Sequence, residues 1–169
     1  DIRIAPGQQG AFDEAIQPGA KNFDMNLQQY SITPERQENI DMSLPYYTSN
    51  QAIVALEGSP AKGAATVADL KDVKFGAQVG TTSLDFINEV IQPTQEVFVY
   101  DDNVGAKAAL EANQIDAAVF DLPTALYVSG VEIEGRCMAR DSTSTVGSAS
   151  RLPSLPTRQG WSMSVARDM

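Results

Sequence analysis

Short apolar runs alternate with helix-like segments from residue 51 onward, and this alternation restricts the fold more than any other feature. The runs QAIVAL, KFGAQV, EVFVY and DAAVF have the composition of buried strands. Amphipathic segments separate them, such as TTSLDFINEVIQ, which places Leu84, Ile87 and Ile91 on one helical face. Strands joined by helices predict an α/β fold with a parallel sheet.

The composition also divides the chain into segments. Residues 51–134 hold the βαβαβα pattern and are expected to form one lobe, whereas residues 1–50 are expected to form part of another. Residues 136–169 contain five arginines, seven serines and no sustained apolar period. Such a composition is typical of loops, so we expect 135–169 to be a polar tail, disordered or non-native, outside the fold.

Charge and residue counts exclude several classes of function. The chain has 22 acidic and 12 basic residues, a net charge of −10, which argues against nucleic acid as a partner. It has no histidine, which removes imidazole catalysis and histidine metal sites. Its one cysteine, Cys137, can form neither an internal disulfide nor a zinc cluster. We therefore predict no metal site and no cofactor. We also predict no enzyme activity, because no acid–base residue is marked out, although Glu or Asp could serve as one.

Polar residues follow two of the predicted strands, where open α/β sheets bind their ligands. Gly80-Thr81-Thr82 joins a strand to a helix, and its hydroxyls either bind an anion or simply cap the helix. Asp121 ends the run AAVF. Its carboxylate either binds a ligand ammonium or caps the helix that begins near Pro123.

Two further charged features lie near predicted helix starts. Arg36 is the only arginine in residues 4–135 and follows a predicted cap at Thr33. Its planar guanidinium suits a carboxylate, although most arginines are ordinary surface residues. The adjacent pair Asp101-Asp102 is better explained by the start of a helix, with Asn103 as the predicted cap, than by catalysis.

Four motifs occur in the order found in one protein family. SITPERQENIDMSLPYYTS, the upstream FDEAIQPGAKNFD, VKFGAQVGTTSLDFI and ALEANQIDAAVFDLPTALYV all resemble segments of bacterial solute-binding proteins of family 3. These proteins are the periplasmic or extracellular receptors for polar amino acids of ABC importers. The resemblance covers roughly residues 10–134.

The resemblance implies a periplasmic-binding-protein-like fold of type II, with two lobes of parallel βα sheets that close on one amino acid. Compared with the family pattern, lobe one is expected to be incomplete. Its first strand–helix unit is missing at the N-terminus, and the chain is altered after about residue 135.

The resemblance also implies a set of ligand-binding residues: Phe12, Gln29, Ser31, Arg36, Thr82 and Asp121. Arg36 would hold the ligand α-carboxylate, assisted by the Ser31 backbone N–H and by Thr82. Asp121 would hold the α-ammonium, assisted by the Ser31 hydroxyl and the Gln29 carbonyl. Phe12 would pack on the ligand side chain. No catalytic residue is implied.

The function implied is that of a monomeric receptor that binds a free amino acid and delivers it to the membrane permease of an ABC transporter. Such a protein is periplasmic, or extracellular and anchored to the membrane. Two alternatives share the fold: the ligand-binding sensory domain of a receptor, and a periplasmic enzyme such as a dehydratase.

Overall fold

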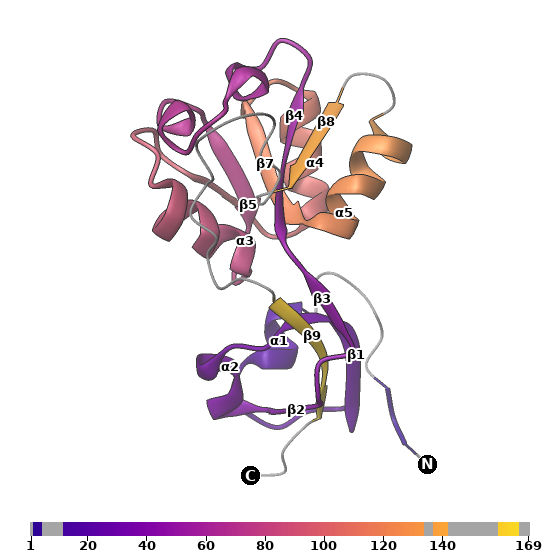
Figure 1. Cartoon of the computed structure of the whole chain (residues 1–169). Coiled ribbons are helices and arrows are strands. Elements are labelled where there is room, and N and C mark those ends of the chain that lie inside the picture. The colour runs from indigo at the N-terminus through magenta and orange to yellow at the C-terminus, as the bar shows by residue number, and fades with distance from the viewer. Residues whose placement is uncertain (1, 5–11, 134–136, 142–158, 166–169) are drawn as a thin grey trace. The chain divides into compact units, whose positions relative to one another are not determined.

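The computed structural model describes residues 2–4, 12–133, 137–141 and 159–165 (Figure 1). The chain divides into two compact units. Unit 1 comprises Asp1–Ser49 together with Arg158–Met169, and unit 2 comprises Asn50–Thr157.

Unit 2 is built on a mixed sheet with the strand order β6-β5-β7-β4-β8. The strands β5, β6 and β7 are parallel to one another, as the alternation of strands and helices predicts. β4 runs antiparallel to both β7 and β8. The strands are β4 (Gln51–Leu56), β5 (Phe75–Gln78), β6 (Phe98–Tyr100), β7 (Ala117–Asp121) and β8 (Cys137–Asp141).

The direction of β4 differs from the expected parallel arrangement. β4 pairs antiparallel with a strand on each side, so its direction is set by strands that lie far from it in the sequence. The connection from β4 to β5 contains two short 3₁₀ helices, η2 (Pro60–Gly63) and η3 (Ala68–Leu70), and β5 begins near the edge at which β4 ends. The first residue of β4 therefore lies at the carboxyl ends of β5 and β7.

Helices cover both faces of this sheet. Two of them continue as π-helical turns, and Gln92 ends the first in the left-handed conformation with φ 49°. The helices of unit 2 are α3 (Thr82–Asp85) with η4 (Phe86–Ile91), α4 (Asn103–Glu111), and α5 (Leu122–Tyr127) with η5 (Val128–Glu132).

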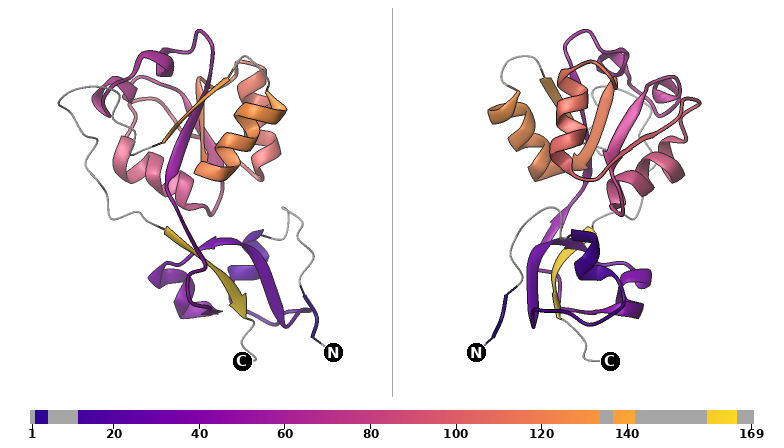
Figure 2. Two further views of the ribbon diagram at one scale, coloured as in Figure 1. Left: turned by 45° about the vertical axis from the view of Figure 1, so that its right-hand side comes forward. Right: turned by 180° about the vertical axis from the view of Figure 1, so that it is seen from behind.

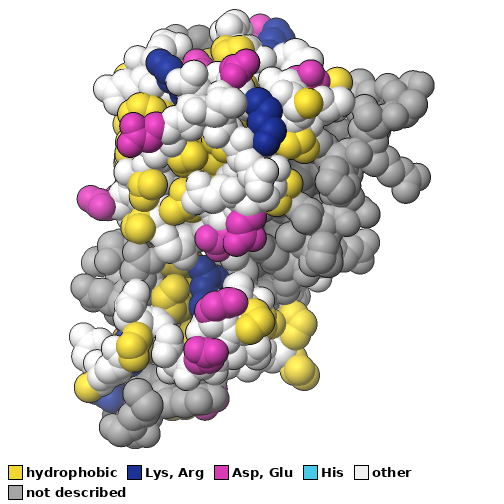
Figure 3. All heavy atoms as spheres, turned by 90° about the vertical axis from the view of Figure 1, so that its left-hand side faces the viewer, with side chains coloured by type: hydrophobic (Ala, Val, Ile, Leu, Met, Phe, Trp, Pro, Cys, Tyr) yellow, Lys and Arg dark blue, Asp and Glu magenta, His cyan; other side chains and the backbone are white. Residues whose placement is uncertain are grey.

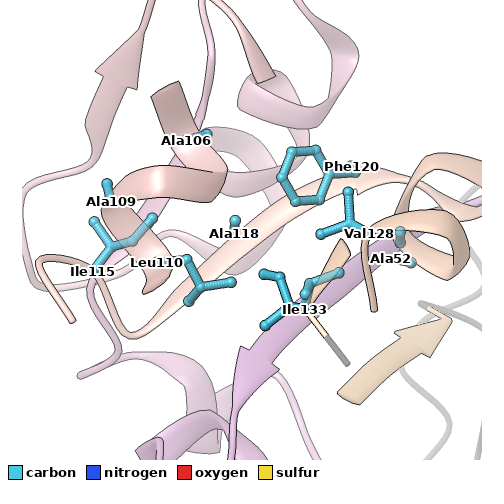
Figure 4. Packing of buried hydrophobic residues seen from close by; sticks show 11 residues of the cluster. Ala52, Ala106, Ala109, Leu110, Ile115, Ala118, Phe120, Val128 and Ile133 are labelled. Carbon is cyan, nitrogen blue, oxygen red and sulfur yellow. The ribbon is translucent and has the colours of Figure 1, made fainter. Parts of the chain in front are cut away.

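The core of unit 2 consists of two apolar clusters on opposite faces of β7. Ala118 and Phe120 pack with residues of α4 and α5, as Figure 4 shows for the first cluster. Ala117 and Val119 pack with residues of α3, η4 and the 3₁₀ helices. Successive residues of a strand point to opposite faces, so β7 is buried on both sides. A buried central strand of this kind fixes the position of Asp121 at its end.

Helix α4 is capped by Asp102 and not by the predicted Asn103. The Asp102 Oδ1 atom accepts a hydrogen bond from the Gly105 backbone N–H at 2.7 Å. Asp102 has an extended backbone, with φ −149°, as the cap position requires, and Asn103 is already the first helical residue. The interpretation of Asp101-Asp102 as the start of a helix is therefore confirmed, with the cap shifted by one residue.

We expect Asp102→Ala to lower the free energy of unfolding by about 1 kcal/mol. The variant removes the side-chain oxygen that accepts the hydrogen bond from the Gly105 N–H. Denaturant titration followed by circular dichroism measures the change. Asp101→Ala is the matched control: Asp101 is exposed, and its replacement should alter stability by less than about 0.5 kcal/mol. Equal effects of the two variants would contradict the cap assignment.

Unit 1 is organised around one antiparallel strand. β9 (Gln159–Val165) pairs antiparallel with β1 (Met25–Ser31), β2 (Asp41–Met42) and β3 (Tyr47–Ser49). The described helices of this unit are α1 (Phe12–Ile16) and α2 (Pro34–Asn39), drawn in indigo in Figure 2. The parallel βα pattern expected for lobe one is thus not the arrangement of this sheet.

The segment 135–169 departs from the expected polar tail. β8 pairs with β4 along five residues of each strand, and β9 pairs with three strands of unit 1. Residues 142–158 lie outside the described part of the chain. The sequence pattern missed both strands because the pairing partners lie far away in sequence, and such contacts override weak local propensity.

An exposed ion pair ties the N-terminal segment to β1. Arg3 Nη2 lies 2.7 Å from Asp24 Oδ1, and the Arg3 Nε and backbone N–H groups donate to Asp24 Oδ2. These hydrogen bonds lower the pKa of the Asp24 carboxyl from its ordinary value of 3.8 to about 2. Any stability that the pair adds is therefore present above about pH 4 and is lost as the pH falls toward 2.

We expect Arg3→Ala to return the pKa of Asp24 toward 3.8, because both side-chain donors are lost. An NMR titration of the aspartate side-chain carboxyls measures this value in both proteins. An unchanged Asp24 pKa in the variant would show that the pair does not persist in solution.

Candidate functional site

The two threonines at the strand–helix junction after β5 have different roles. Gly80 makes the turn with φ 68°, in the left-handed region that glycine readily adopts. Thr81 caps α3: its Oγ1 accepts from the Leu84 N–H at 3.3 Å. Thr82 is buried in the first helical position. The capping interpretation therefore applies to Thr81 and leaves the Thr82 side chain for another role.

Asp121 occupies the cap position of α5, but its side chain makes no capping hydrogen bond. The Asp121 Oδ1 atom instead accepts a hydrogen bond from Gln51 Nε2 at 2.7 Å. The side chain is partly buried at the end of a strand whose other residues are buried. This geometry contradicts the interpretation of Asp121 as a helix cap. A carboxylate held at the carboxyl end of a central strand is well placed to meet a cation.

Gln51 connects Asp121 with Thr82. It is the first residue of β4 and faces Asp121 directly in the antiparallel register. Besides its bond to Asp121, Gln51 Nε2 lies 3.3 Å from Thr82 Oγ1. The structure thus brings together Thr82 and Asp121, both predicted as site residues, through a glutamine that the sequence did not single out. A polar residue opening an apolar strand was the available signal, but its importance depends on the direction of β4.

In unit 1, Arg36 is buried, so the interpretation as an ordinary surface arginine is wrong. Its Nη1 donates to the Ser31 carbonyl oxygen at 2.9 Å, and its guanidinium carbon lies 5.7 Å from the centre of the Phe12 ring. Thr33 caps α2, as predicted, and accepts from the Arg36 backbone N–H at 3.3 Å. These contacts orient the guanidinium, which can pair with a carboxylate through two parallel bonds.

Phe12 and Ser31 accompany Arg36, whereas Gln29 is exposed. The Phe12 ring packs on Tyr30 with ring centres 4.4 Å apart, and Ser31 is buried at the end of β1. Gln29 lies where the register between β1 and β9 shifts, between Asn26 and Tyr30. The role of the Gln29 carbonyl in binding the ligand ammonium stays a prediction.

Surface charge alone does not locate these groups. On the face drawn in Figure 3, acidic, basic and apolar side chains are intermixed. Within the described residues, no three His, Cys, Asp or Glu side chains gather as a set of metal ligands. None of the described helices combines the length and apolarity needed to cross a bilayer. The strand ends and helix starts are therefore the best guide to the site.

Curated relatives of this chain are amino-acid-binding proteins. The chain is 33% identical over 113 residues to the ABC transporter arginine-binding protein 1 of Escherichia coli K12. The matched segment covers 66% of this chain and 44% of the relative. It is 32% identical over 120 residues to a probable histidine-binding protein of Campylobacter jejuni, covering 68% and 43% of the two chains. The chain thus spans less than half the length of these relatives.

A solved structure and a family profile agree with these relatives. An ancestral arginine-binding protein bound to glutamine superposes with a TM-score of 0.66 at 27% identity, covering 86% of this chain and 58% of the other. Residues 7–124 match the profile of one family, and this span includes all six predicted site residues. The chain belongs to the bacterial extracellular solute-binding proteins, family 3.

Proposed function

We propose that this chain binds a free amino acid in its zwitterionic form, as the extracytoplasmic receptor of an ABC importer. The observation that carries the proposal is the Asp121 side chain, which does not cap α5 and is held by Gln51 beside Thr82 at the strand ends. Family membership supports the same function, because the matched relatives are named as binding proteins for arginine and histidine.

Each charge of the ligand is assigned one oppositely charged residue. Arg36 binds the α-carboxylate, and its guanidinium is already oriented by the Ser31 carbonyl and the Phe12 ring. Asp121 binds the α-ammonium from the end of β7. A buried ion needs such a partner, since an unpaired charge costs several kcal/mol away from water.

The remaining predicted residues have supporting roles. The Thr82 hydroxyl and the Ser31 backbone N–H assist Arg36 with the carboxylate. The Ser31 hydroxyl and the Gln29 carbonyl, which lies in the irregular part of β1, assist Asp121 with the ammonium. Phe12 packs on the ligand side chain. We assign no catalytic step to any of these residues.

Family membership also supports a proposal for the protein's wider setting. We propose that it acts as a monomer outside the cytoplasm, in the periplasm or anchored at the outer face of the membrane, and passes its amino acid to a membrane permease. A sensory role would use the same binding residues with a different partner. An enzyme on this scaffold would reveal itself by conversion of the bound ligand.

Thermal-shift measurements with single amino acids test the proposal. Arginine, histidine, cystine and glutamine are the first probes, because the relatives and the matched structure name them. A ligand present at about 100 times its Kd adds about 2.7 kcal/mol of apparent stability and raises the Tm by several degrees. No shift with cystine or with any of the twenty common amino acids would refute the proposal. Recovery of a chemically altered ligand would favour the enzyme.

A further inference from the structure

Gln51 forms the polar end of a ladder of cross-strand pairs that is otherwise apolar. On one face of the sheet, Ala55 lies opposite Ala117 and Ile53 opposite Val119. Three of these residues belong to the buried cluster that includes η4, and Ile53 packs against that cluster. The next pair along this face is Gln51 opposite Asp121. Directly opposed side chains of antiparallel strands lie close enough to interact. The pattern therefore changes from packing to hydrogen bonding at the edge of the sheet where the ligand is expected.

The orientation of the Gln51 amide is determined by its neighbours. An ionised carboxylate only accepts hydrogen bonds, so the amide group 2.7 Å from Asp121 Oδ1 must be the Nε2 donor. The amide oxygen then faces Ser83, whose hydroxyl donates to Gln51 Oε1 at 2.6 Å. Gln51 is 1% exposed. Its amide is thus held from both ends in a buried setting.

The same amide also orients Thr82. Gln51 Nε2 points at Thr82 Oγ1, at 3.3 Å, which makes the threonine oxygen the acceptor in this contact. The Thr82 hydroxyl hydrogen is consequently directed away from Gln51. One glutamine side chain thereby contacts both a carboxylate and a hydroxyl, the two groups of unit 2 assigned to the ligand.

We propose that Gln51 is a positioning residue of the amino-acid site, which holds Asp121 and Thr82 in their binding orientations before the ligand arrives. The assignment rests on the function proposed above. Preorganised groups bind more tightly because less side-chain freedom is lost on binding. The hydrogen bond from Gln51 to Asp121 is shorter than its contact to Thr82. We therefore expect binding of the ligand ammonium to depend more strongly on Gln51 than binding of the ligand carboxylate does.

The test compares Gln51→Met with wild type by calorimetric titration of L-arginine and of its deaminated analogue. Methionine matches glutamine in length and lacks both the donor and the acceptor. We expect Gln51→Met to weaken arginine binding about tenfold and binding of the deaminated analogue less than about threefold. Gln114→Met is the matched control, since Gln114 is exposed, and it should leave both affinities unchanged.

A double-mutant cycle separates positioning from a general loss of structure. In an Asp121→Asn background, Gln51→Met should weaken arginine binding less than about threefold, because the ammonium contact that Gln51 supports is already lost. Equal losses for both ligands, or a further loss of about tenfold when Gln51→Met is added to Asp121→Asn, would overturn the assignment. If a different amino acid binds more tightly than arginine, the same comparison uses that amino acid and its deaminated analogue.

A second measurement needs no ligand. In the wild-type chain, the Gln51 side-chain amide protons should exchange with solvent at least about tenfold more slowly than those of exposed Gln114. Asp121→Ala removes the nearer of the two acceptors of Gln51 Nε2 and should speed this exchange several-fold. Rapid exchange in wild type would overturn the proposed role of Gln51 alone. Protected Gln51 protons in a chain that binds no amino acid would instead refute the proposed function, and the positioning role with it.

Discussion

Replacing Arg36 by alanine is expected to weaken amino-acid binding by about two to four orders of magnitude, with L-arginine as the first probe. The variant leaves the ligand carboxylate without its cation, which costs about 3–5 kcal/mol when the partner is buried. Arg36→Lys should recover only part of this loss, because an ammonium cannot form the two parallel bonds of a guanidinium. Isothermal titration calorimetry measures both variants.

Two controls separate binding from folding in this experiment. Arg36 also contacts the Ser31 carbonyl and the Phe12 ring, so its loss can disturb unit 1 itself. Thermal unfolding of each variant identifies such damage, and Arg36→Lys retains the charge. Arg3→Ala removes another arginine of unit 1 that is exposed and paired with Asp24, and it should leave binding unchanged. Less than a threefold change in Arg36→Ala would refute the role of Arg36.

Asp121→Asn is expected to weaken binding of an amino acid by about 10- to 100-fold. The amide keeps the size of the side chain but removes the negative charge that pairs with the ligand ammonium, and hydrogen bonds to charged groups contribute about 1.5–3 kcal/mol. The deaminated analogue lacks that ammonium, so its affinity should change less than about threefold. The ratio of the two affinities is therefore the quantity to measure.

The matched control for Asp121 is Asp101→Asn, which removes an exposed carboxylate beyond another strand end, after β6. It should leave the ratio of the two affinities at the wild-type value. If Asp121→Asn weakens both ligands by the same factor, Asp121 has a structural role and the ammonium assignment is wrong.

Local sequence signals predicted the elements of unit 2 well where the elements are regular. The run AAVF is buried on both faces as β7, and Ile87 and Ile91 are buried on one side of the helix that follows β5. In unit 1, Thr33 caps α2 as expected. Hydrophobic period and capping chemistry act within a few residues of each other, which is why a single sequence reveals them.

Features that depend on distant pairing were not predictable in this way. The antiparallel direction of β4 is set by its partner strands, and the role of Gln51 follows from that direction. The polar segment GWSMSV forms most of β9, where it pairs with three other strands. Its own sequence does not show these partners. The cap of α4 is Asp102 and not the predicted Asn103. Both residues have side chains suited to capping, so only the backbone conformation distinguishes them.

Isothermal titration calorimetry of the wild-type chain with one amino acid and two of its analogues tests the central claim most directly. The amino acid is the one that gives the largest thermal shift, and the analogues lack either its α-amino or its α-carboxyl group. Recognition of a zwitterion by Arg36 and Asp121 predicts that the intact amino acid binds and that each analogue binds at least about tenfold more weakly. Equal affinity for all three compounds, or no binding of the intact amino acid, would contradict the account.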